Sequence, residues 1–96
     1  AAMLITAAEA QLLAANAGRG QALLAAALAA DIDDNLLERI AALPKLPAEA
    51  LILDTKKLIT KRGETVPRLL LLAQLCERAG RSGEAANYRQ QAAHLS

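Results

Sequence analysis

The sequence predicts an all-α protein, and three features lead to that prediction. The hydrophobic fraction of 54% is made mainly of alanine and leucine, and aromatic residues make up only 1% of the chain. Alanine and leucine favour helices, whereas strands are enriched in β-branched and aromatic residues. Apolar residues recur at helical spacing, and glycines and prolines divide the chain into about six segments. We therefore expect about six helices, paired as antiparallel hairpins.

Glycines mark the first expected boundary. Gly18 and Gly20 separate a helix over residues 2–17 from a second helix over residues 20–30. Glycine populates backbone angles that end a helix, so this spacing is typical of a turn between two helices. Alanine and leucine dominate both segments, and small side chains allow neighbouring helices to approach closely.

An acidic stretch and a pair of prolines bound the third expected helix. Residues 31–35, with the sequence DIDDN, open this helix, and Asn35 and Glu38 have the spacing of a capping box. The prolines in LPKLP, residues 43–47, end it near Leu43, because a residue before proline is steered away from helical angles. A rigid corner should follow.

The fourth expected helix runs over residues 47–62 and ends at Gly63, placed as a left-handed cap. Its apolar positions follow a period of 3.6 residues and predict a single inward stripe. That stripe consists of Ala48, Leu51, Ile52, Thr55, Leu58 and Ile59.

The last two expected helices meet at Gly80. The fifth begins with Thr65 as a favourable N-cap and Pro67 in the first turn, and it is apolar around most of its circumference. Such a helix is either packed between neighbours or presents apolar surface to a partner. Ser82 is expected to cap the sixth helix, whose inward residues are Ala85, Tyr88, Ala92 and Leu95.

Composition bounds the domain count and the classes of function. The 96 residues allow one domain at most, and the start Ala-Ala-Met suggests a piece of a longer protein. A net charge of +1 argues against a nucleic-acid binder. Residues 21–30 supply only about half of an apolar membrane span, so no span is expected. One cysteine excludes an internal disulfide and a multi-cysteine metal site. The compartment stays open, with the cytoplasm favoured.

No group of residues indicates catalysis, a cofactor or a metal. The acidic residues 31–35 lack the glycine and the glutamate of a calcium loop, and carboxylates are favoured at a helix N-terminus in any case. His94 has no partner at helical spacing, and Cys76 lies on an inward stripe. The basic side chains of Lys45, Lys56, Lys57, Lys61, Arg62 and Arg68 are not interleaved with aromatic residues, so a solvated helix face is expected. We therefore expect that the chain is not an enzyme.

Residues 69–95 carry a repeat-like pattern in which Gly80 reverses the chain and the small residues Ala73 and Ala85 lie where two helices cross. The stretch resembles a tetratricopeptide repeat at Leu69, Leu72, Ala73, Cys76, Gly80, Glu84, Ala85, Ala92 and Leu95. It departs from that family in lacking bulky aromatic residues and in placing arginine at position 89. Helical hairpins begin about every 33 residues, which is typical of stacked repeats. The resemblance implies a short right-handed α-solenoid.

This resemblance also implies a function. Tetratricopeptide-like arrays bind a partner protein or peptide in a groove lined by the first helix of each pair, which here carries over to Leu70, Gln74, Glu77 and Arg78. The partner is another protein or another domain of the parent chain. Two alternatives are an accessory helical domain of a larger enzyme or regulator, and a homo-oligomerisation domain that pairs through Leu70, Leu71 and Leu75.

Overall fold

In the computed structural model, which describes residues 1–30 and 32–96, all regular secondary structure in these ranges is helical and no strand is present. The all-α prediction is confirmed, and six α-helices are present in the described residues. They are α1 (Ala2–Leu13), α2 (Ala17–Ala29), α3 (Leu37–Ala41), α4 (Ala48–Arg62), α5 (Val66–Arg78) and α6 (Ser82–Leu95), with a 3-10 turn, η1 (Asp34–Leu36), before α3. Asp31, the first residue of the acidic stretch, lies outside the described residues.

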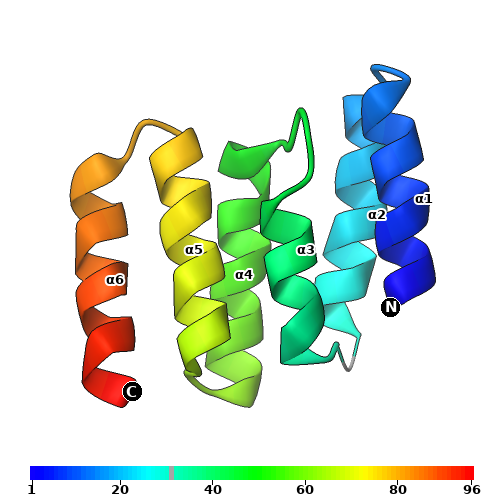
Figure 1. The fold of residues 1–96 in the computed structure, drawn as a ribbon. Helices are drawn as coiled ribbons and strands as arrows, with labels where there is room; N and C mark the ends of the chain where they lie inside the picture. Colours follow the sequence, from blue (N-terminus) through cyan, green and yellow to red (C-terminus); the bar gives the residue numbers. More distant parts are fainter. Residues whose placement is uncertain (31) are drawn as a thin grey trace.

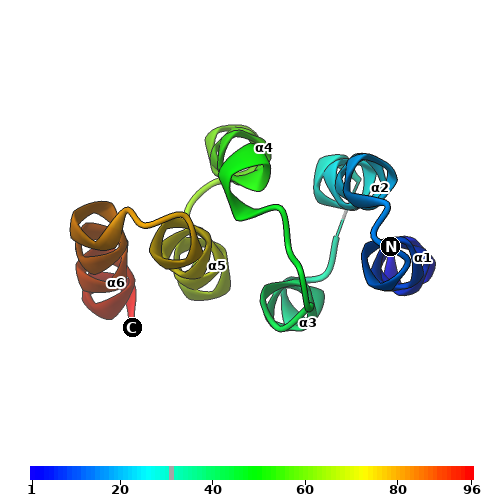
Figure 2. The ribbon, with the colours of Figure 1, turned by 90° about the horizontal axis from the view of Figure 1, so that it is seen from above.

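The helices lie side by side in a slab whose extents are 38 × 28 × 18 Å (Figure 1). α1 packs on α2, α4 on α5, and α5 on α6. Helices that are not consecutive in the sequence also pack together: α2 contacts α4, and α3 contacts α5. Figure 2 shows α2 and α4 on one side of the slab with α3 on the opposite side. The short α3 and the longer α5 therefore form neighbouring walls on one face.

One apolar cluster runs through the slab and joins all of these helices. Leucine supplies most of its volume, and alanine lets the helix backbones come close. Ala73 on α5 and Ala85 on α6 are both fully buried, as expected of small residues between packed helices. The cluster includes Ile5, Ala8, Leu12, Leu24, Ala27, Leu28, Ile32, Leu37, Ile40, Leu43, Leu51, Ile52, Leu58, Leu71, Leu72, Leu75 and Cys76.

The predicted boundaries of α4 and α5 are confirmed. Gly63 ends α4 as predicted, but with a φ of 97° and a ψ of 170° in place of left-handed helical angles; its positive φ still favours glycine. Thr65 is the N-cap of α5, and its hydroxyl oxygen accepts a hydrogen bond from the backbone N–H of Arg68 at 3.3 Å. Pro67 stands in the first turn, where its missing N–H costs nothing.

The predicted boundary between the first two helices was wrong. α1 ends at Leu13, and both Gly18 and Gly20 lie inside α2. The turn is made by Ala15, whose φ is 62°. Gly20 serves a different purpose, because a Cβ atom there would lie 2.6 Å from Cδ2 of Leu12. A glycine at this position lets α2 pack directly against α1.

Two predicted caps were also wrong. Asp33, not Asn35, caps the entry to α3: its carboxylate accepts from the backbone N–H of Asn35 at 2.9 Å. The reason is that the chain enters α3 through the 3-10 turn, which moves the cap back along the chain. Ser82 is the first residue of α6 and makes no capping hydrogen bond, because Arg81 already occupies the N-cap.

The inward face predicted for α6 holds in part. Ala85 and Ala92 are buried and Tyr88 is half-buried, but Leu95 is 50% exposed. Leu95 is the last residue of α6, and no later helix covers it within the described chain. None of the described helices combines the length and the apolar character that crossing a membrane requires.

Candidate functional site

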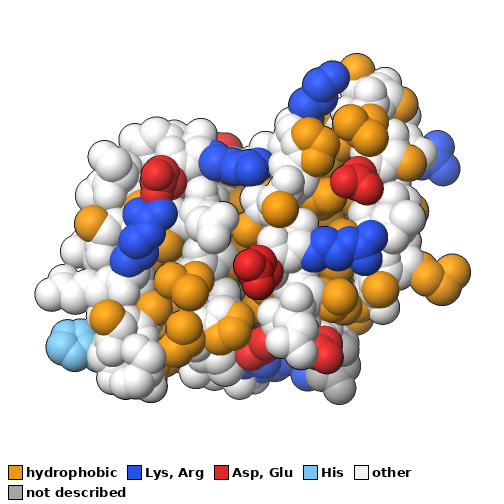
Figure 3. All heavy atoms as spheres, viewed as in Figure 1, with side chains coloured by type: hydrophobic (Ala, Val, Ile, Leu, Met, Phe, Trp, Pro, Cys, Tyr) orange, Lys and Arg blue, Asp and Glu red, His pale blue; other side chains and the backbone are white. Residues whose placement is uncertain are grey.

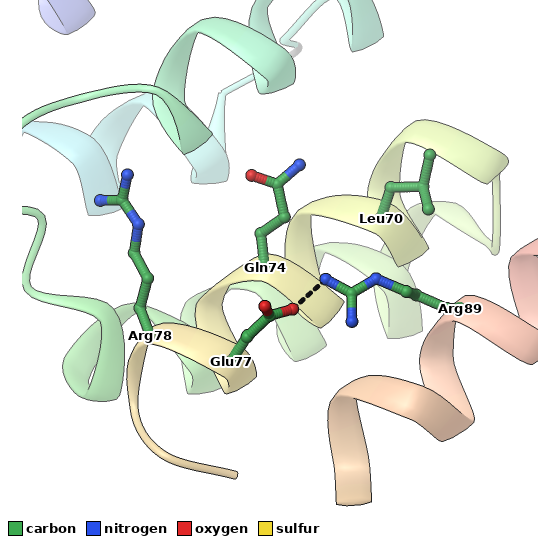
Figure 4. Close-up of a pocket in the computed structure, with 5 residues that line it drawn as sticks. All are labelled: Leu70, Gln74, Glu77, Arg78 and Arg89. Atoms are coloured by element: carbon green, nitrogen blue, oxygen red, sulfur yellow. Dashed lines mark hydrogen bonds and ion pairs between the residues drawn. The ribbon is translucent and has the colours of Figure 1, made fainter. Parts of the chain in front are cut away.

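The four residues predicted to bind a partner line one hollow on the surface. Leu70, Gln74, Glu77 and Arg78 project from α5, and Arg89 of α6 completes the lining (Figure 4). The hollow has a volume of about 350 Å³ and is open to solvent. The structure thus brings the predicted residues together with one residue that the sequence analysis did not include.

Helical periodicity places these side chains on one face of α5. Leu69, Leu72, Ala73 and Cys76 turn inward and are buried, so the remaining face carries Leu70 and the three polar residues. Leu70 is 39% exposed, which makes it the only large apolar side chain of α5 that is open to solvent. An exposed leucine among polar side chains offers apolar contact area without forming a large apolar patch.

Polar contacts hold three of the lining side chains. Glu77 and Arg89 form an ion pair that links α5 to α6 (Figure 4). Arg78 donates a hydrogen bond from a guanidinium nitrogen to the backbone carbonyl of Leu43, at 2.9 Å. These contacts tie the lining of the hollow to α6 and to the loop after α3.

A second hollow, of about 270 Å³, continues the first one toward α3. The two hollows are neighbours that share Leu70 and Gln74 as lining residues, and we call them together the α5 groove. The lining of the second hollow consists of Asp34, Asn35, Leu37, Glu38, Ala41, Pro67, Leu70, Leu71 and Gln74. The α5 groove therefore extends from α3 across α5 to α6.

A hydrogen-bonded network holds the α3 side of the groove against the start of α5. Arg68 pairs with the Asp34 carboxylate at 3.1 Å, and the hydroxyl of Thr65 donates to the other oxygen of that carboxylate at 2.9 Å. The Arg68 guanidinium also donates to the backbone carbonyl of Gly63 at 2.9 Å. A network of several bonds around a largely buried arginine fixes the wall better than a single exposed ion pair would.

The sequence analysis missed Arg89 and the α3 side of the groove. Arg89 was not among the residues named for the partner-binding groove, although one signal pointed to it. Glu77 and Arg89 are twelve residues apart, which is also the spacing of Ala73 and Ala85. Ala73 and Ala85 were expected to lie where the two helices cross, and α5 does pack on α6. No sequence signal indicated that α3 would lie beside α5, because that packing skips over α4.

The surface predicted for self-association was wrong. Leu71 is 2% exposed and Leu75 is 0% exposed, so neither can meet a second copy. α5 packs against α3, α4 and α6, and these neighbours cover the side chains. Of the three leucines in that prediction, only Leu70 remains accessible.

The predicted basic region is divided in the structure. Lys57, Lys61 and Arg62 line a separate hollow of about 220 Å³ between α2 and α4, together with Asp54. Arg68 has been drawn into the pair with Asp34 instead. Figure 3 shows the face of Figure 1 as a mosaic in which apolar side chains lie among basic and acidic ones, and no single charge dominates.

Cys76 is fully buried in the core, as predicted for a small apolar residue. Burial raises the pKa of its thiol, and the nearby charge of Glu84 acts in the same direction. A thiol with a raised pKa is less nucleophilic at neutral pH. Among the described residues, no three or more His, Cys, Asp or Glu side chains gather in a way that could hold a metal ion.

The chain was compared with known protein families, with curated proteins and with solved structures, and no match was found. Its own geometry therefore carries the functional argument.

Proposed function

We propose that this chain is a non-catalytic interaction module that binds a segment of a partner protein in the α5 groove. The observation that carries the proposal is the meeting of Leu70, Gln74, Glu77, Arg78 and Arg89 around one open hollow. An exposed leucine supplies apolar affinity, and tethered polar groups around it set the orientation of a bound segment. Surfaces of this kind bind protein segments by combining an apolar anchor with a polar rim.

The arrangement we propose for the whole chain is a tetratricopeptide-like solenoid of antiparallel hairpins. Support comes from the repeat-like pattern of residues 69–95 and from the packing of α1 on α2 and of α5 on α6. In such arrays, successive helix pairs line a shared concave surface. The α5 groove would be part of that surface.

Selection from a displayed random-peptide library, followed by measured affinities of the enriched peptides, tests this function. We expect wild-type protein to enrich peptides, and Leu70→Asp to weaken their binding about tenfold or more, because a carboxylate replaces the apolar anchor. Leu53→Asp is the matched control, since Leu53 on α4 is 60% exposed and lies outside the groove.

Circular dichroism of both variants checks that they remain folded. Leu53→Asp should bind the enriched peptides as the wild type does. Failure of the wild type to enrich any peptide, or equal binding by folded Leu70→Asp, contradicts the proposed function.

A further inference from the structure

Among the described residues, Glu38 is the one charged side chain lining the α5 groove that makes neither a hydrogen bond nor an ion pair. It lines the hollow beside α3 and is exposed, and its carboxylate makes no hydrogen bond or ion pair with any described residue. Asp34, in the same hollow, is neutralised by Arg68. In the first hollow, Glu77 is paired with Arg89 of α6, and Arg78 is held by the backbone carbonyl of Leu43 after α3.

The hollow beside Glu38 has a mixed lining and a limited size. Leu37, Ala41 and Leu71 line it but are buried, so Leu70 supplies its exposed apolar surface. The hollow of about 270 Å³ lies below the range of roughly 300–1,000 Å³ typical of small-molecule pockets. It therefore suits one long side chain of a bound segment better than a separate ligand.

Electrostatics selects the kind of side chain that can enter. An acidic side chain would be repelled by Glu38, and a purely apolar one would remove water from an unpaired carboxylate, which is costly. Lysine and arginine avoid both penalties, because their aliphatic stems pack on apolar surface while their charged ends stay polar. The amide oxygens of Asn35 and Gln74, at the same rim, can accept further hydrogen bonds from such a cation.

We infer that the segment bound in the α5 groove places a lysine or arginine side chain between α3 and α5, with its stem on the exposed Leu70 and its cation on Glu38. This inference rests on the proposed function and adds a requirement about the partner. It also fixes an orientation, because the basic residue lies at the α3 end and the remaining contacts lie toward Glu77 and Arg89.

The test uses the full chain and peptides enriched by the wild type from the displayed library. We expect those peptides to share a lysine or arginine, and Glu38→Gln to weaken their binding about fivefold. Replacing the shared lysine of one peptide by methionine should cost about the same, and combining both changes should add little, since the two groups act as a pair. Added salt should weaken wild-type binding more than binding by Glu38→Gln.

A second selection with Glu38→Lys sharpens the test, because it should enrich aspartate or glutamate at the position where the wild type enriches a cation. Glu64→Gln is the matched control, since Glu64 is exposed and lies away from the α5 groove, and it should bind as the wild type does. If Leu70→Asp abolishes binding but the peptides carry no shared cation, or Glu38→Gln binds equally well, the inference is wrong and the groove stands. If Leu70→Asp also binds normally, the proposed function itself fails.

Discussion

The first and the last helical pairs reverse the chain with the same hydrogen bonds but with different residues. After α5, the N–H of Arg81 bonds to the carbonyl of Cys76 at 2.7 Å, with Gly80 at a φ of 80°. After α1, the N–H of Asn16 bonds to the carbonyl of Gln11 at 2.8 Å, with Ala15 at a φ of 62°. Both are Schellman motifs, which normally place glycine at the left-handed position.

This difference shows that one turn is relaxed and the other is strained. Glycine adopts positive φ freely, whereas alanine in the left-handed region costs about 1–2 kcal/mol. The surrounding packing must supply that energy at Ala15, because the local sequence does not favour the conformation. In the first pair, packing between α1 and α2 therefore decides the turn, whereas in the last pair the glycine already favours it.

The packing of the first pair can be broken at Gly20. Gly20→Ala should lower the free energy of unfolding by about 1–3 kcal/mol, because the added Cβ would lie 2.6 Å from Cδ2 of buried Leu12. Urea denaturation followed by circular dichroism measures the change. Gly18→Ala is the control, since a Cβ at Gly18 meets nothing within 4 Å and helix propensity improves. Equal stability of both variants would show that α1 and α2 are not in close contact.

The relaxed turn of the last pair can be strained at Gly80. Gly80→Ala should destabilise the protein by about 1–2 kcal/mol, because alanine would have to adopt the φ of 80° seen there. A Cβ at this position has open space, so the loss comes from the backbone alone. Gly83→Ala, inside α6 and equally open, should instead be neutral or slightly stabilising in the same denaturation experiment. A neutral Gly80→Ala would contradict the difference drawn between the two turns.

The sequence predicted the helix boundaries at the last pair but not the boundary at the first pair. Where a local signal and the packing agree, as at Thr65, Gly63 and Gly80, the predicted boundaries match the structure. The turn at Ala15 could not be predicted, because alanine carries no signal for positive φ. Gly18 and Gly20 were read as a boundary because glycine can end a helix, but Gly20 is required by contact with a distant part of the chain.

The candidate site divides in the same way. Helical periodicity on α5 was enough to place Leu70, Gln74, Glu77 and Arg78 on one face, and these side chains do line one hollow. The other walls depend on which helices become neighbours. Glu38 reaches the groove only because α3 packs on α5, and Leu71 is hidden for the same reason. Such contacts skip an intervening helix, and no local pattern in either segment specifies them.

The smallest of the expected effects tests the strained turn directly. Ala15→Gly should raise the free energy of unfolding by about 1 kcal/mol, because glycine relieves the cost of the left-handed conformation, less its larger entropy in the unfolded chain. Ala14→Gly is the matched control: its φ of −81° is ordinary for alanine, so glycine there should destabilise by about 0.5–1 kcal/mol. Opposite signs at two adjacent alanines cannot arise from composition or helix propensity. Destabilisation by both changes would mean that Ala15 carries no backbone strain and that the two turns do not differ.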